Sequence, residues 1–356
     1  MKTVSSRWYN IDFLRILFVI IIVYYHFIGA SYATSYGEPF TTLCYNSRSS
    51  GGICNSALFM MSGFFLYYSI LKADSFLAFV KHKVFRIWPC LAFLIFCIAV
   101  CSVFDIAKFD IGQNFLNLCF IHKNGSALTT KLSNANVSWF VCTLFWLSLF
   151  FFCIFKIAFK NYQGALFFIS LLCWITLSIY INNPGREAFT VLYGMLSKSM
   201  AGAMACTSAG ILIAAIFEKT NIKNMKLNFY IASICEILIT FYIVRVLIFV
   251  RFKEQYITII ILFSILFILF LLRGGVISKL LDNKYFSFIG KYAYSIYVMQ
   301  NFSFILFDNF LWKLKVLVTF SPYLMICISL LVSILIGVVT YHFIERPVAK
   351  YLKRFE

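Results

Sequence analysis

Residues 11–27 read IDFLRILFVIIIVYYHF, an apolar run long enough to cross the hydrocarbon core of a bilayer as a helix. The run nevertheless holds Asp12, Arg15 and His26, and a charge inside hydrocarbon costs roughly 2.5 to 3.5 kcal/mol on insertion scales. Arg15 and His26 are close to three helical turns apart, so they share one face, about 16 Å apart along the axis. Asp12 precedes Arg15 by three residues and shares that face. This pattern favours a polar stripe facing the interior of a helix bundle over an interfacial ion pair with a histidine near the far headgroups.

The composition extends this interpretation to the whole chain. Of its 356 residues, 62% are hydrophobic and 12% are charged, and the mean hydropathy is +0.89. A soluble globule is nearer half apolar and a quarter charged. The sequence therefore predicts an all-α polytopic membrane protein. The net charge of +18 does not indicate a nucleic-acid partner, because the basic residues lie in short loops between apolar runs, which is typical of membrane topology signals.

Apolar runs of membrane-spanning length occur about ten times, without an internal repeat or a low-complexity linker. We therefore predict a single domain over residues 1–356. Ten spans place both termini on one side of the membrane. The loops and tails of that side hold 18 Lys and Arg residues, against 10 on the other side, so both termini are expected in the cytoplasm. The predicted spans are 10–29, 55–71, 88–106, 138–158, 164–182, 200–217, 227–250, 256–272, 287–307 and 322–344.

A second cluster of ionisable residues precedes the third predicted span, in the stretch KADSFLAFVKHKVFRIWP of residues 72–89. Pro89 suits the start of that span. Taken alone, the basic residues are best explained as a loop that stays on the cytoplasmic side. They also fit a phosphate-binding site, since Lys and Arg are what anionic phosphates require. The candidates for that site are Lys83 and Arg86.

Four weaker patterns remain. Ser62 and Gly63, within FMMSGFF, favour close helix packing over a nucleophile. His342 and Glu345 share a face near Pro347, which is expected to end the last span, and they fit a charge-paired helix end better than a metal site. Cys44 and Cys54 flank one polar loop and are the two cysteines that suit a disulfide if that loop faces the periplasm. Glu236 and Arg245 face opposite ways on the seventh span, so each needs a separate partner.

Taken in order, these motifs resemble those of the acyltransferase family 3 membrane O-acetyltransferases, from Asp12 to Pro347. Asp12, Arg15 and His26 match the opening motif of the family. The SGF element at residues 62–64 and the closing Ile-Glu-x-Pro at residues 344–347 match as well. Singly the motifs are weak, but six in order on matching spans are specific. The remaining elements that resemble the family are residues 83–89, the tryptophan-led Trp139-Phe140-Val141, and the stretch from Tyr294 through Tyr297 to Gln300.

The chain departs from the family pattern at two positions. Lys83 stands where the family has the first arginine of a pair, which keeps the charge but loses the planar fork. Gln300 stands where a histidine is usual, which argues against a mechanism with two histidines. The additional hydrolase-like domain that some relatives carry is not expected in this chain.

The resemblance implies transfer of an acyl group, usually acetyl, from cytoplasmic acetyl-CoA to a sugar hydroxyl, with no metal. The acceptor is expected to be a surface polysaccharide, such as an O-antigen of lipopolysaccharide, or a lipid-linked glycan, in a bacterial cytoplasmic (inner) membrane. Lys83, Arg86 and Arg15 would bind the phosphates of the donor, and His26 would act as general base or carry the acyl group. Asp12 would orient Arg15, and Glu345 would hold a basic residue of the phosphate site.

Two other classes of function fit the same features. A transporter or flippase for an amphiphilic glycan also has broken helices and charges at mid-membrane, but it would move substrate without using coenzyme A. A non-catalytic membrane assembly partner would tolerate the loss of His26.

Overall fold

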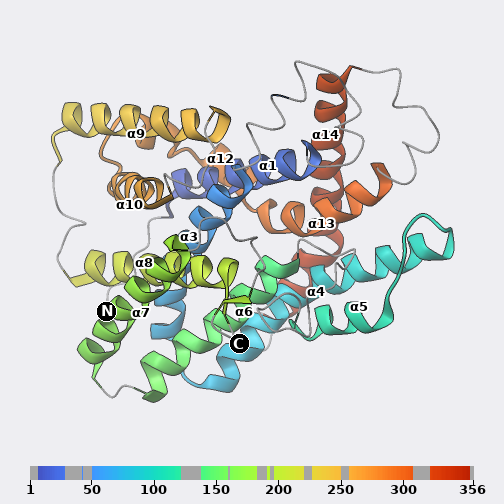
Figure 1. Ribbon diagram of the computed structural model, residues 1–356, viewed down its shortest axis with the longest axis horizontal. Coiled ribbons are helices and arrows are strands. Elements are labelled where there is room, and N and C mark those ends of the chain that lie inside the picture. Colours follow the sequence, from blue (N-terminus) through green and yellow to red (C-terminus); the bar gives the residue numbers. More distant parts are fainter. Residues whose placement is uncertain are drawn as a thin grey trace.

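The computed structural model describes residues 7–28, 42, 50–121, 138–158, 161–182, 191–192, 196–219, 227–249, 256–307 and 321–352. Within these residues the chain is almost entirely helical, and one antiparallel pair of two-residue strands joins Val191 to Ser197 (Figure 1). Among the described residues, eight helices are long and apolar enough to cross a membrane. The predicted all-α polytopic membrane fold is therefore confirmed.

Each predicted span corresponds to helical structure. The first six are α1 (Tyr9–Ile28), α3 (Ser50–Lys72), α4 (Phe76–Val103), α6 (Ser138–Cys153) with the π-helix η4 (Ile154–Ala158), α7 (Tyr162–Ile181) and α8 (Lys198–Lys219). The next are α9 (Phe229–Phe249), the shorter α10 (Tyr256–Leu272), the pair α12 (Lys284–Gly290) and α13 (Ala293–Ile305), and α14 (Pro322–Thr340), which continues through η7 (Tyr341–Glu345) into α15 (Arg346–Leu352). Short helices α5 (Ile111–Leu118) and α11 (Val276–Leu281) and strands β1 (Val191–Leu192) and β2 (Leu196–Ser197) complete the described elements.

The third helix begins earlier than predicted. Ser75 caps α4, accepting a hydrogen bond from the backbone N–H of Ala78, so the helix includes the basic residues of the stretch 81–86. Pro89 lies inside α4 rather than at its start. The charges of residues 81–86 suggested a loop, but they occupy early turns of a helix that extends beyond the apolar run.

The ninth and tenth spans also differ from the prediction. The ninth is two helices, α12 and α13, separated at Lys291 and Tyr292. Pro347 does not end the last span, since α15 continues to Leu352. The widened π-turn of η7 precedes it, so the proline lies in the first turn of a new helical segment, where its missing N–H is tolerated.

The crossing of α3 and α8 depends on small residues. A Cβ atom at Gly63 would overlap the backbone carbonyl of Thr207, and one at Gly210 would overlap that of Met60. The two backbones therefore touch, as the predicted packing role of the Ser62-Gly63 pair requires. Trp139 and Phe140 of α6 pack beside this crossing, with ring centroids 5.9 and 4.2 Å from that of Phe59.

Helix α1 lies at the centre of the bundle and packs against α3, α12, α13 and α14 (Figure 1). Its first turn is tied to the α10–α11 turn. Asn10 Nδ2 donates to the carbonyl oxygens of Phe270 and Ser278, and the N–H of Tyr9 donates to Asp282. These bonds fix where α1 begins.

The partner of Glu236 is the start of α11. Its carboxylate is fully buried and accepts backbone N–H bonds from Gly275, Ile277 and Ser278 at 2.8 to 3.0 Å. A buried carboxylate that accepts several N–H groups at a helix N-terminus needs no cation beside it. Glu236 therefore joins α9 to the same turn that holds α1.

Candidate active site

Asp12 is buried at the start of α1 and pairs with two arginines. Its carboxylate is 2.8 Å from Arg7 Nε and 3.4 Å from an Arg15 terminal nitrogen. The shorter contact is the stronger one, so Arg7 rather than Arg15 is its main partner. The backbone of Gly290, at the end of α12, lies directly against Asp12, and a Cβ atom there would approach the Asp12 Cβ to 2.8 Å.

The basic residues predicted on the first helix and in the loop before the third span interact electrostatically. Arg15 lies over the ring of Phe65, 5.6 Å from its centroid, with 32% of its side chain exposed. It is close enough to Arg86 of α4 for the two positive charges to interact. Lys83 interacts with Arg86 in the same way. Arg86 therefore interacts with a like charge on each of two residues, Arg15 and Lys83, so an anion bound beside it would be stabilised.

Glu345 lies beside this basic cluster, defined by Arg15, Lys83 and Arg86. Its charge interacts with that of Arg86, but its direct hydrogen bond is donated by Ser295 of α13. The neighbouring Tyr294 donates to the backbone carbonyl of Ile87, 2.6 Å away. These two bonds fix α13 against η7 and against the turn of α4 that carries Arg86. The roles of Tyr294 and Ser295 were missed, although both lie in the tyrosine-rich motif of the sequence.

His342 and Glu345 do not form a shared site. The Nε2 atom of His342 is 3.2 Å from the Tyr292 hydroxyl, whereas Glu345 bonds to Ser295. No group of three His, Cys, Asp or Glu side chains in the described part of the chain could hold a metal ion. The ammonium of Lys291, also at the α12–α13 break, lies 3.6 Å from the ring centroid of Phe288.

His26 lies at the opposite end of α1 from Arg15. Because α1 is a continuous helix, the two side chains have the expected separation of about 16 Å. The imidazole packs against the rings of Tyr25 and Phe304, with centroids 5.1 and 5.9 Å away. Phe304 follows Gly290 by as many residues as His26 follows Asp12, so α1 runs parallel to the α12–α13 pair.

Polar side chains of α13 lie one turn below Phe304. Gln300 is fully buried, and its Nε2 donates to the Tyr297 carbonyl, 2.8 Å away. Its Oε1 and the Nδ2 of Asn301 have no hydrogen-bond partner among the described residues. Tyr297 packs on Phe140, with ring centroids 5.0 Å apart. The position at which the family usually has a histidine is therefore a buried amide with an unused acceptor.

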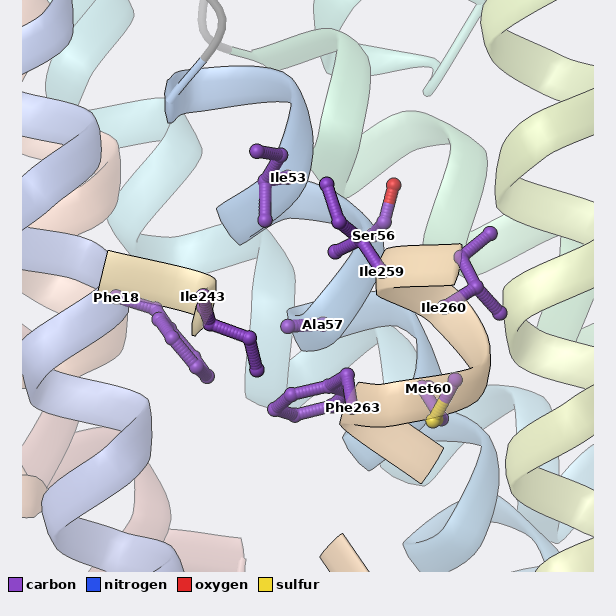
Figure 2. Close-up of a pocket in the computed structure, with 9 residues that line it drawn as sticks. All are labelled: Phe18, Ile53, Ser56, Ala57, Met60, Ile243, Ile259, Ile260 and Phe263. Carbon is purple, nitrogen blue, oxygen red and sulfur yellow. The ribbon is translucent and has the colours of Figure 1, made fainter. Parts of the chain in front are cut away.

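Neither of two cavities beside α1 includes the predicted site residues. The smaller has room for little more than a water molecule and lies between α1, α3, α9 and α10. Figure 2 shows Phe18, Ile243 and Phe263 around it. The larger, of about 560 Å³, shares Phe18, Ile243 and Phe263 with the smaller one and extends along α1. Cys54 is a buried thiol, and Cys44 lies outside the described residues, so their pairing stays a prediction.

A family model described as an acyltransferase domain matches residues 8–342, nearly the whole chain. The chain belongs to acyltransferase family 3. This acyltransferase is an integral membrane protein, and its described helices carry the motif residues in the order that the resemblance implied. Comparisons with curated proteins and with solved structures give no significant match.

Proposed function

We propose that this membrane acyltransferase transfers an acetyl group from acetyl-CoA to a sugar hydroxyl of a surface polysaccharide or lipid-linked glycan. The observation that supports the proposal is that the charge of Arg15, on α1, interacts with the charge of Arg86, on α4. Two cations from distant parts of the chain, with Lys83 beside them, suit the phosphates of the donor.

The arrangement along α1 suits a long, thin donor. With the phosphates at Arg15, the pantetheine arm would run along the face that leads to His26, about 16 Å further along the helix. The thioester would then lie beside the imidazole. Basic-residue counts support a cytoplasmic position for the Arg15 end, on the side of a bacterial inner membrane where acetyl-CoA is available.

The chemical step needs one base and no redox change. His26 accepts the proton of the sugar hydroxyl while the oxygen attacks the thioester carbonyl carbon. The C–S bond breaks, the new C–O ester bond forms, and the imidazolium returns its proton to the departing sulfur. Alternatively, the imidazole attacks first, and the sugar hydroxyl then attacks the acyl-histidine. Both routes give one ester and one free thiol.

The proposal is tested by incubating purified protein with acetyl-CoA labelled in the acetyl group and with a glycan-bearing membrane extract. Labelled glycan and free coenzyme A in equal amounts are expected. Movement of glycan across vesicles without consumption of acetyl-CoA would instead show a flippase. Consumption of acetyl-CoA that is unchanged in His26→Ala would exclude a catalytic role for His26.

A further inference from the structure

The larger cavity runs along α1 on the face away from the basic cluster. It has a volume of about 560 Å³, within the range of sites that hold small molecules. Its walls come from α1, α9, α10 and α11, with Ser50 from the start of α3. Phe13 and Tyr24 both line it, so it follows α1 for about 16 Å. Leu17 projects into it, nine residues before His26 and therefore on the opposite face of the helix.

The lining is apolar over this whole length. Besides Tyr24, the only polar side chains among the described residues of the wall are Ser50 and Thr240. The Thr240 hydroxyl has no hydrogen-bond partner among the described residues. A sugar or a peptide inside this cavity would leave its own polar groups unsatisfied, which is costly within a membrane. A hydrocarbon chain carries no such groups, so it is the occupant that the lining favours. The principal apolar wall residues are Leu17, Ile21, Val244, Leu247, Phe263 and Leu281.

One end of the cavity reaches the surroundings of His26. Tyr24 and Ser50 line that end. The residue after Ser50 is Gly51, whose backbone lies against the Tyr25 ring so closely that a Cβ atom would overlap it. The Tyr25 ring in turn contacts the His26 ring. A ligand that leaves the cavity past Ser50 therefore meets the end of α1 where the imidazole lies.

We propose that this cavity holds the hydrocarbon chain of a lipid-linked sugar, with the sugar at the Tyr24–Ser50 end beside His26. This inference rests on the proposed function and selects the lipid-linked acceptor over a soluble polysaccharide. Helix α1 then separates two elongated ligands. The donor follows its polar face, the lipid follows its apolar face, and the two meet at the end that carries His26.

The direct test is photo-crosslinking of the full-length protein in phospholipid nanodiscs, without acetyl-CoA. The probe is a prenyl-phosphate-linked hexose with a diazirine in its chain. Peptides from α1 and α9 are expected to be labelled, and an excess of the same compound without the diazirine should abolish the labelling. A phosphatidylethanolamine with a diazirine in its acyl chain serves as the comparison for bulk lipid.

A matched pair of substitutions on α9 tests the location. Val244 lines the cavity, and Val244→Trp should fill part of it and reduce competable labelling by about tenfold. Leu238 is 62% exposed on the same helix and is not part of the lining, so Leu238→Trp should leave labelling within about twofold of the wild-type level. Leu17→Phe, from the opposite wall, repeats the test if Val244→Trp does not purify as a folded protein.

Two results would overturn the inference. The phosphatidylethanolamine probe could label α1 and α9 even in the presence of excess prenyl-linked hexose. That result would show that the cavity holds a structural lipid. Labelling of α1 and α9 that Val244→Trp and Leu17→Phe leave unchanged would place the chain elsewhere. A parallel assay of acetyl transfer to a methyl glycoside reports on the proposed function alone, because that acceptor has no chain to bind.

Discussion

Ser295 donates a hydrogen bond to Glu345, 50 residues further along the chain, and so joins the start of α13 to the π-turn of the last helix. The carboxylate also interacts with the charge of Arg86. Ser295 is fully buried, so this pair is shielded from competing water. The bond therefore keeps an acid beside the basic cluster without a direct ion pair to any of its members.

Removing either partner is expected to weaken donor binding. Ser295→Ala and Glu345→Ala should each raise the KM for acetyl-CoA about tenfold or more, since a hydrogen bond to a charged group contributes about 1.5 to 3 kcal/mol. The double variant should be little worse than either single variant, because both remove the same interaction. Effects that add fully in the double variant would show that the two residues act independently.

Arg86→Ala should raise the KM for acetyl-CoA about tenfold or more, because one phosphate contact is lost. Lys83→Arg keeps the charge and restores the arginine pair that the family pattern has, so donor binding should be maintained or improved. The control is Lys81→Ala, which removes an equal charge from an exposed position on the same helix. Equal effects of Arg86→Ala and Lys81→Ala on the KM would show that the basic residues of α4 set membrane orientation and do not bind the donor.

Gly290→Ala tests the contact between α12 and α1. The added methyl group would lie 2.8 Å from both the Cβ and the backbone oxygen of Asp12, so α12 must move away. We expect a loss of about 1 to 3 kcal/mol of stability, seen as a lower Tm in detergent. Gly112→Ala is the matched control, because its nearest contact would be 3.4 Å away on an exposed helix. An unchanged Tm in Gly290→Ala would show that this contact is not tight.

Glu236→Ala should destabilise the acyltransferase more than most substitutions on α9. Three backbone N–H groups at the start of α11 would lose their acceptor, and the same turn holds Asn10 of α1. Glu236→Gln keeps one carbonyl oxygen as an acceptor, so its Tm should lie between those of Glu236→Ala and the wild type. Ile237→Ala, at a neighbouring half-exposed position, provides the baseline. A Tm for Glu236→Ala equal to that baseline would contradict the anchoring role.

The helices and the Arg15–His26 separation could be predicted because both depend on local sequence. Apolar runs mark the spans, and the helical repeat fixes which residues share a face. The partner of Glu236 could not be predicted, since its ligands are backbone N–H groups some 40 residues away and leave no pattern in side-chain types. The start of α4 was misplaced because the predicted span followed the apolar run alone, whereas Ser75 caps the helix before the charged residues.

Asp12 shows the same limit at the candidate site. Sequence spacing pointed to Arg15, three residues away, as its partner. The closer contact is with Arg7, which precedes the apolar run. Spacing rules describe residues within one helix, and they do not describe side chains that reach back from the segment before it.

Substitutions at the two ends of α1 should have different effects, one on acyl transfer and the other on donor binding. His26→Ala should retain acetyl-CoA binding but lose transfer by roughly a hundredfold or more, the effect expected from losing a general base. Arg15→Ala should weaken donor binding by about tenfold while the protein still folds, because Arg7 remains 2.8 Å from the buried Asp12. Arg7→Ala and Arg15→Ala together should leave that carboxylate without its cations and prevent normal purification. Calorimetry of donor binding alongside a transfer assay separates these effects. Full transfer by a folded His26→Ala variant would contradict the catalytic role of this helix, and unchanged donor binding in Arg15→Ala would contradict its place in the phosphate site.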